Sequence, residues 1–439
     1  MLSRIVRVDI LGGADIGKSS ALVEVLDRDG QHKYIMIDCG VGFARGNEPV
    51  PLPLRPRVRP DLLVKTHGHS DHIMLAPRYL ADYDCPTWMT GPTYFTADFL
   101  MLDHLRVAEL RGTTPVFNRQ EYVRFHTSDK VEIFYHSDWM EVFPGVSICF
   151  YPCGHIRGAA SILLETDIYK SMFSGDISFN NTPTVRGMVP PLNFHPDALF
   201  LDSTNGCNSL PNREAEVQRL VEMAGQYRLA LVPAFGVGRS PDIALDLARH
   251  DYPVFLDGMG RAILKAYGRE EMFWCENDRE IPPEIFNRIR FIKGGDPGRE
   301  RVAYDFRPKA VVTTSGMMAG GPVMHYAEKW LGKSDAAVLD VGYVAPNTPG
   351  GQLLQSVESG MPFEIYPGHE IKVAAHVAKF YLSAHIDGPQ NVELVKSLQP
   401  KKVYTGHGEP VSREGLAGLL RSQGFDAEAL QEGQVIEFE

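Results

Sequence analysis

The sequence lacks long hydrophobic runs and has few cysteines. None of its apolar stretches reaches the roughly 18 residues that a membrane-spanning helix needs. Its six cysteines are scattered over 439 residues, and their spacing fits neither a zinc ribbon nor a disulfide framework. The first apolar stretch carries Arg4, Arg7 and Asp9, which is atypical of a signal peptide. We therefore expect a soluble, cytoplasmic protein with no membrane partner.

Positive charge is also scarce. The chain has 44 Lys and Arg residues against 55 Asp and Glu residues, a formal net charge of −11. Proteins that bind nucleic acids usually present a basic surface. A polyanionic ligand would therefore need local positive charge, supplied by a metal or by a groove lined with basic side chains. The 44% hydrophobic content is typical of a globular protein, and the length predicts two or three domains.

The pattern of apolar segments changes along the chain. Residues 5–11, 20–26 and 34–37 predict closely spaced strands. Beyond residue 207, apolar strands alternate with helical segments, as in 229–233 followed by 240–249. This alternation predicts a parallel sheet. The sequence therefore predicts an α/β protein in which a second α/β unit is inserted into a β-rich one.

The strongest motif is H-G-H-S-D-H at residues 67–72, directly after a predicted buried strand. Residues two apart at a strand end point the same way, so His67 and His69 can bind one metal. Asp71 and His72, in the following turn, can face a second metal. Imidazole and carboxylate ligands suit zinc, or manganese where carboxylates bridge. The alternative is a polar loop whose histidines make only protein hydrogen bonds.

Three further residues of ligand type follow predicted strands beside glycine: His155, Asp176 and His407. Glycine lets the backbone approach a site closely. Each residue alone is more often structural. Together with the motif at 67–72, they complete two metal coordination spheres.

This ordered set resembles the metallo-β-lactamase-fold nucleases that carry a β-CASP insert, the family of ribonuclease J and of the cleavage and polyadenylation nuclease. The resemblance implies an αββα metallo-β-lactamase fold over residues 1–206 and 383–439, with the β-CASP insert over 207–382. It implies that Asp38 supports the ligand loop without binding metal. It also implies one metal on His67, His69, His155 and Asp176, and a second on Asp71, His72, Asp176 and His407.

The motifs special to the β-CASP proteins match Asp202, His385 and His407. A histidine at the third position is typical of the RNA-cleaving branch. The resemblance implies that His385 is a general acid held in one tautomer by Asp202, and that Asp71 takes part in catalysis with the metals. The alternative for His385 is a core histidine. Three positions depart from the pattern: Asp202 is usually glutamate, Asn205 replaces a tyrosine, and Asp15 stands where the early glycine-rich stretch often has glutamate.

Two glycine-rich segments resemble the substrate-side segments of the family. The first, 233–239, ends at Arg239, which could contact an RNA phosphate or simply face solvent. The second, 314–322, opens a helix whose amides could cradle a 5′-monophosphate or form only a tight turn. The candidate residues of this segment and its helix are Ser315, Gly316, Gly320, Gly321 and His325. Arginines at 45, 55, 57 and 59 lie in a proline-rich stretch that predicts an extended loop, either along an RNA groove or in solvent.

These patterns predict a two-metal ribonuclease, with two zinc ions or manganese, that acts on single-stranded RNA. The products would carry a 5′-phosphate and a 3′-hydroxyl, and the segment 314–322 slightly favours 5′-exonucleolytic action. The family is compatible with a homodimer. Two alternatives remain open: a DNA nuclease, phosphodiesterase or ester hydrolase of the same fold, and a non-catalytic RNA-binding subunit. The second usually loses ligands, which this sequence retains.

Overall fold

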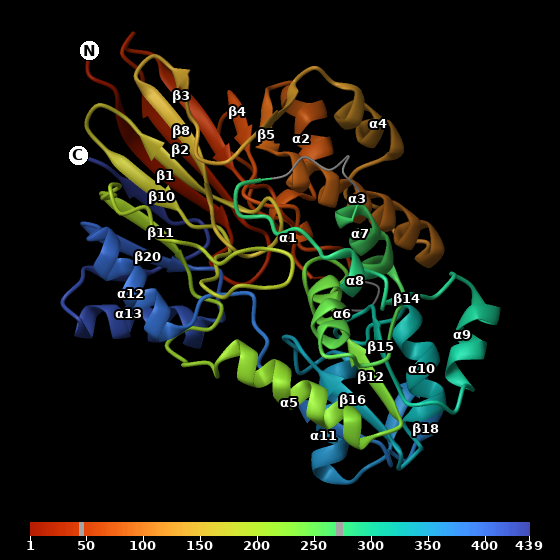
Figure 1. Cartoon of the computed structure of the whole chain (residues 1–439). Coiled ribbons are helices and arrows are strands. Elements are labelled where there is room, and N and C mark those ends of the chain that lie inside the picture. Colours follow the sequence, from red (N-terminus) through yellow and green to blue (C-terminus); the bar gives the residue numbers. More distant parts are fainter. Residues whose placement is uncertain (44–47, 269–274) are drawn as a thin grey trace.

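The computed structural model describes residues 1–43, 48–268 and 275–439. Figure 1 shows a β-sandwich flanked by helices and, beside it, a second body built around its own sheet. None of the helices in the described part of the chain combines the length and the apolar character needed to cross a membrane.

Two seven-stranded sheets form the sandwich. The first has the order β22-β1-β2-β3-β4-β5-β6. Its strands are β1 (Arg4–Gly12), β2 (Ser20–Leu26), β3 (His32–Ile37), β4 (Leu62–Val64), β5 (Thr87–Thr90), β6 (Val131–Phe134) and β22 (Val435–Glu437). The second has the order β21-β20-β11-β10-β9-β8-β7. Its strands are β7 (Trp139–Phe143), β8 (Val146–Pro152), β9 (Ala160–Glu165), β10 (Lys170–Phe173), β11 (Ala198–Asp202), β20 (Lys402–Gly406) and β21 (Ala427–Ala429).

Alternating side chains of the two sheets fill the space between them. Ile5 and Val23 from the first sheet share one buried cluster with Ile148 and Ile162 from the second. The outer face of the first sheet, including Leu63, packs on one group of helices: α1 (Ser70–Ile73), α2 (Ala76–Tyr83), α3 (Gly91–Arg111) and α4 (Arg119–Thr127). The outer face of the second packs on α12 (Gly388–Leu398) and α13 (Pro410–Ser422). The layers are therefore helix, sheet, sheet, helix.

A six-stranded sheet of order β14-β13-β15-β12-β16-β19 forms the centre of the second body, and every strand pair in it is parallel. Its strands are β12 (Leu229–Pro233), β13 (Val254–Leu256), β14 (Arg290–Phe291), β15 (Lys309–Thr313), β16 (Ala336–Asp340) and β19 (His376–Lys379). Its helices are α5 (Arg213–Gln226), α6 (Arg239–Arg249), α7 (Met259–Tyr267), α8 (Pro283–Phe286), α9 (Asp296–Ala303), α10 (Pro322–Trp330) and α11 (Pro349–Ser359). A hairpin of β17 (Phe363–Tyr366) and β18 (His369–Ile371) completes it.

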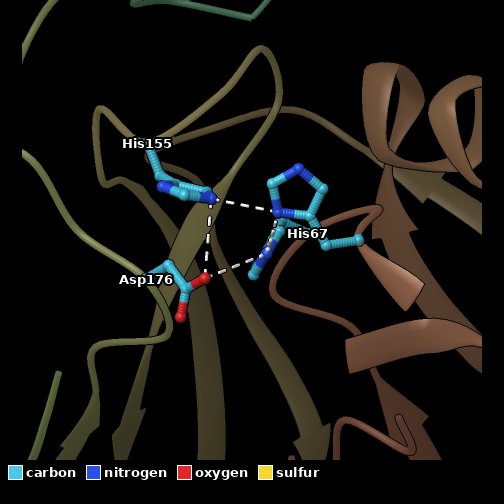
Figure 2. A group of neighbouring side chains, drawn as sticks. His67, His155 and Asp176 are labelled. Atoms are coloured by element: carbon cyan, nitrogen blue, oxygen red, sulfur yellow. Dashed lines mark hydrogen bonds and ion pairs between the residues drawn. The ribbon is translucent and has the colours of Figure 1, made fainter. Parts of the chain in front are cut away.

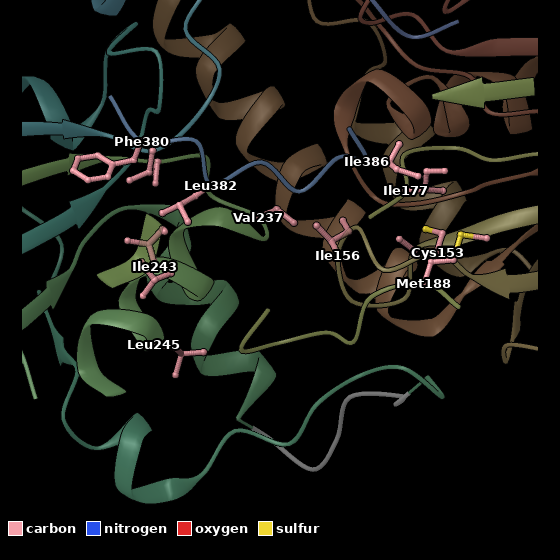
Figure 3. Packing of buried hydrophobic residues seen from close by; sticks show 14 of the residues in the cluster. Cys153, Ile156, Ile177, Met188, Val237, Ile243, Leu245, Phe380, Leu382 and Ile386 are labelled. Carbon is pink, nitrogen blue, oxygen red and sulfur yellow. The ribbon is translucent and has the colours of Figure 1, made fainter. Parts of the chain in front are cut away.

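A continuous apolar cluster joins the two bodies. Ile156 and Ile177 of the sandwich belong to the same buried cluster as Val237, Leu382 and Ile386, as Figure 3 shows. The chain leaves the sandwich after β11, forms the parallel sheet and returns along residues 380–387 past this cluster. The predicted αββα fold with an inserted α/β unit is confirmed. The boundaries at 206 and 382 stay predictions.

Candidate metal centre and active site

The candidate ligands follow the carboxyl ends of four strands of the sandwich. The motif at 67–72 follows β4, His155 follows β8, Asp176 follows β10 and His407 follows β20. β4 belongs to the first sheet and the other three strands belong to the second. The ends of the two sheets therefore bring these residues together at one rim of the sandwich, although they are far apart in the sequence.

Four side chains form a first cluster, shown in part in Figure 2. His69 Nδ1 lies 3.1 Å from His67 Nε2 and 3.1 Å from His155 Nε2. Asp176 Oδ2 lies 3.4 Å from His67 Nε2 and 3.5 Å from His155 Nε2. All four ligand atoms lie within 4.8 Å of one another. This spacing lets a single cation contact all of them.

A second cluster contains Asp71, His72 and His407. His407 Nε2 lies 3.4 Å from Asp71 Oδ2 and 3.4 Å from His72 Nε2. The second oxygen of Asp176, Oδ1, lies 3.3 Å from His72 Nε2 and 3.4 Å from His407 Nδ1. The Asp176 carboxylate therefore stands between the two clusters, with one oxygen toward each.

The chemistry of these groups fits divalent cations. Asp176 is buried and its Oδ1 accepts no hydrogen bond, an arrangement that costs free energy unless a cation compensates for it. Burial lowers the pKa of His67, His69 and His155, which favours the neutral imidazole that binds metal. Burial also opposes protonation of His407, but the carboxylates of Asp176 and Asp71 together outweigh it and raise the His407 pKa to about 9. The negative charge that raises the His407 pKa also attracts a metal cation.

A second layer of hydrogen bonds orients the ligands. Asp38 Oδ2 lies 2.7 Å from His72 Nδ1, so His72 turns Nε2 toward the second cluster. Asp38 also accepts hydrogen bonds from the amide and the hydroxyl of Thr66, at 2.8 and 2.7 Å. His155 Nδ1 lies 2.9 Å from the carbonyl oxygen of Ala384, on the segment that returns from the insert. Such partners fix the tautomer and orientation of a metal ligand.

His385 lies beside both clusters. Its ring centroid is 4.7 Å from that of His155 and 5.9 Å from that of His407. Its Nδ1 lies 2.8 Å from Asp202 Oδ2, so the aspartate reaches the imidazole despite being shorter than the usual glutamate. Burial opposes protonation of His385, but the carboxylates of Asp202 and Asp176 outweigh it and raise its pKa. Asn205, a second departure from the family pattern, donates from Nδ2 to the His385 carbonyl oxygen at 3.1 Å.

The predicted substrate-side segments lie against each other at the insert sheet. A Cβ added at Gly316 would lie 3.1 Å from the amide nitrogen of Phe235, four residues before Arg239. Ser315 Oγ accepts a hydrogen bond from the Ala319 amide at 2.9 Å. The following turn reaches left-handed backbone geometry, with φ of 115° at Gly320 and 82° at Gly321. Its role in phosphate binding stays a prediction.

The cationic candidates differ in their surroundings. Arg239 begins α6 with a guanidinium whose Nε is buried and donates no hydrogen bond; burial lowers the Arg239 pKa to about 10. His325, on α10, lies 3.6 Å from the Glu300 carboxylate. Of the loop arginines, Arg45 lies outside the described residues, and Arg57 forms ion pairs with Asp9 and Glu24.

Sequence reasoning missed three hydroxyl groups at the site. One is that of Thr66, whose Oγ1 also lies 3.1 Å from His67 Nδ1. Ser19 Oγ lies 3.3 Å from His72 Nε2, and Thr204 Oγ1 lies 3.1 Å from His407 Nδ1. Thr204 stands two residues after Asp202, and this proximity to a recognised motif could have identified it. Ser19 stands in a glycine-rich turn with no comparable motif.

Replacing Gly40 with alanine is expected to distort the turn that carries Asp71 and His72. An added Cβ would lie 1.6 Å from the Asp71 carbonyl oxygen and 2.5 Å from the His72 amide nitrogen, so backbone must move. We expect Gly40→Ala to destabilise the fold by about 1–3 kcal/mol and to weaken metal binding, measured by denaturant unfolding and elemental analysis. Gly225→Ala in α5, which meets no atom within 4 Å, should instead stabilise by about 0.5–1 kcal/mol. Equal stability and metal content of Gly40→Ala and Gly225→Ala would contradict the close packing at Gly40.

Metal loading is expected to raise the melting temperature. The buried, mutually facing ligand atoms bind cations only in the folded state, so a cation present at 100 times its dissociation constant adds about 2.7 kcal/mol. Melting curves of chelated and of zinc- or manganese-loaded protein measure this effect. His67→Ala should reduce the shift, and identical curves with and without metal would argue against the site.

Three family models match the chain. They are the metallo-beta-lactamase superfamily over residues 16–200, the Beta-Casp domain over 243–353, and the Zn-dependent metallo-hydrolase RNA specificity domain over 370–430. The solved structure of a protein of unknown function from Enterococcus faecalis V583 has a TM-score of 0.62 and covers 99% of this chain and 100% of its own. At 13% sequence identity, that likeness concerns the fold alone.

Several curated archaeal proteins are similar in sequence. Transcription termination factor FttA of Methanocaldococcus jannaschii is 29% identical over 388 residues, which cover 81% of this chain and 58% of FttA, so the chain spans less than two thirds of that relative. RNase aCSPSF2 of Saccharolobus solfataricus is 29% identical over 97% of this chain and 84% of its own length. An RNase J-like protein of M. jannaschii is 26% identical, with 86% of each chain covered.

The ligand motifs follow the strand ends of a metallo-β-lactamase sandwich, and the matched segments cover both that sandwich and its insert. The chain belongs to the metallo-β-lactamase-fold family of β-CASP nucleases.

Proposed function

We propose that this protein is a metal-dependent ribonuclease that hydrolyses single-stranded RNA with two divalent cations, zinc or manganese. The observation that carries the proposal is the Asp176 carboxylate between two sets of ligands, with the His385–Asp202 pair beside them. Relatives with RNase names support an RNA substrate, as does the match to an RNA specificity domain.

In this proposal each part of the site has a separate task. Divalent cations at the two clusters would lower the pKa of water and neutralise negative charge on the phosphate. Asp176 would supply one oxygen to each cluster, and Asp71 would supply a ligand oxygen to the second. His385, with Nδ1 held by Asp202, would give the proton on Nε2 to the leaving 3′-oxygen. The products then carry a 5′-phosphate and a 3′-hydroxyl.

The insert supplies the other wall of the site. Because β19 runs parallel to its neighbour β16 and leads within six residues to His385, the carboxyl edge of the insert sheet faces the metal clusters. Loops 234–238 and 314–321 also follow strands at this edge. We propose that they guide the RNA strand, and that 314–321 receives a 5′-monophosphate in an exonucleolytic mode.

The test uses metal-loaded protein and single-stranded RNA labelled at the 3′ end, with a 5′-monophosphate or a 5′-hydroxyl. We expect cleavage of RNA but not of a matched DNA strand, and none by the Asp71→Ala, His72→Ala double variant. A ladder that shortens from the 5′ end, faster with the monophosphate, would support the exonucleolytic mode. Internal cuts indifferent to the 5′ group would instead indicate an endonuclease. Metal-bound protein that leaves RNA intact would refute the proposed function.

A further inference from the structure

One exposed aromatic side chain links the insert to the loop that carries His407 and Glu409. Tyr343 follows β16 at the carboxyl edge of the insert sheet, and 42% of its surface is exposed. Its hydroxyl donates to Glu409 Oε1 at 3.4 Å. Glu409 stands two residues after His407, and two extended residues span at most about 7 Å. The Tyr343 hydroxyl therefore lies against the loop that carries His407, a candidate ligand of the second cluster.

The residues around Tyr343 hold the loop that carries it. A Cβ added at the preceding Gly342 would lie 3.6 Å from Phe235 Cε2, and one at Gly316 would lie 3.4 Å from Phe235 Cδ2. Phe235 therefore wedges between the loops after β15 and β16, which fixes the backbone beneath Tyr343. The hydrogen bond to Glu409 holds the far end of the side chain. Held at both ends, the ring loses little conformational freedom when a flat ligand stacks on it.

The charged and apolar side chains around Tyr343 decide which part of a nucleotide can bind there. Glu409 is an exposed carboxylate and repels phosphate. Val411, two residues further on, exposes 85% of its surface, so the rim beside the carboxylate is apolar. Arg239, a candidate phosphate contact, follows β12, another strand of the same sheet edge. The surroundings of Tyr343 thus suit an uncharged, flat base face better than a phosphate.

We propose that the Tyr343 ring, braced by Glu409, is a stacking platform for one nucleobase of the RNA strand next to the cleaved bond. This inference rests on the proposed function. Stacking needs an unpaired base, so the platform makes the site select single-stranded over paired RNA. It tolerates all four bases, because each has a π-face.

The test combines variants with substrates that lack one base. Tyr343→Leu should lower kcat/KM on single-stranded RNA by roughly 5- to 160-fold, the range for stacking one base on an aromatic ring. Tyr343→Phe, which keeps the ring, should retain most of the activity. An abasic site scanned along the strand should lower wild-type kcat/KM sharply at one position near the cut. At that position Tyr343→Leu should show no further loss.

Tyr304→Leu is the matched control. Tyr304 exposes 59% of its surface but precedes β15, at the opposite edge of the insert sheet, so its loss should leave kcat/KM unchanged. Unchanged melting temperature and metal content would establish that Tyr343→Leu is folded. The inference is overturned if the abasic scan lowers the kcat/KM of Tyr343→Leu and of the wild type at the same position and by the same factor. It is also overturned if Tyr343→Phe loses as much kcat/KM as Tyr343→Leu. Wild-type protein that cleaves no RNA would overturn the proposed function, and this inference with it.

Discussion

His385→Asn is expected to lower kcat by about 10²–10⁴-fold, the usual contribution of a positioned general acid. The side chain lies 2.8 Å from Asp202 and outside the first cluster, and it also groups with Asp176 and His407 within reach of a cation. If His385 acts as the acid, its loss should leave metal content unchanged, whereas a lost ion would mark it as a ligand. Single-turnover cleavage and elemental analysis of the same preparation measure the two quantities together. His376→Asn is a matched control, because that histidine is exposed on β19 and stacks on Tyr227.

A modified substrate separates proton donation from structural support. When sulfur replaces the bridging 3′-oxygen, the leaving thiolate needs no proton, so the acid becomes dispensable. His385→Asn should then cleave nearly as fast as wild type, while a variant that has lost metal should stay slow on both substrates. An equal deficit on the oxygen and sulfur substrates would mean that His385 is not the acid.

Asp176→Asn is expected to be the most damaging single change to the site. The substitution keeps the shape of the side chain but removes the charge that faces both clusters, at 3.3 to 3.5 Å from four histidines. We expect metal content to fall to one ion or none per chain. Activity should fall by at least about 10³-fold, because charge stabilisation by the metals is worth several kcal/mol.

Asp38→Asn provides the comparison for Asp176→Asn. Asp38 orients His72 from behind and contributes no atom to either cluster. Its loss should cost about 10–100-fold in metal affinity or activity, as for other partners of metal ligands. Isothermal titration of chelated protein with zinc compares the two variants. An Asp176→Asn variant that still binds two ions would contradict the bridging role.

The elements with simple apolar patterns could be predicted closely from the sequence. The strand predicted at 229–233 is β12, and the helical segment predicted at 240–249 lies within α6. The stretch that contains α3 and α4 lacks such a simple pattern. α3 buries Thr93 and Thr96 yet exposes Leu102 and Leu110, so its apolar residues mark no single face. α4, which follows, is short and mostly polar.

The candidate site could be predicted where ligand types stand beside glycine after a strand. The supporting hydroxyls could not, because serine and threonine are common and their role depends on the pairing of distant segments. Arg239 could not be placed either, since burial of its guanidinium arises from the packing of α6. Tyr343 carries no local pattern at all. Its contact with Glu409 exists only because the insert folds back over the loop that carries His407.

The position of β20 has a consequence for protein synthesis. β20 pairs with β11 on one side and β21 on the other, inside the second sheet, and Thr204 meets His407 across 203 positions of sequence. A ribosome that adds about 5–20 residues per second therefore needs roughly 10–40 s to extend the nascent chain from one to the other. During that interval the emerging polypeptide contains every residue of the first cluster but lacks His407 of the second. Under the proposed function, a chain released in that interval should leave its own messenger uncut.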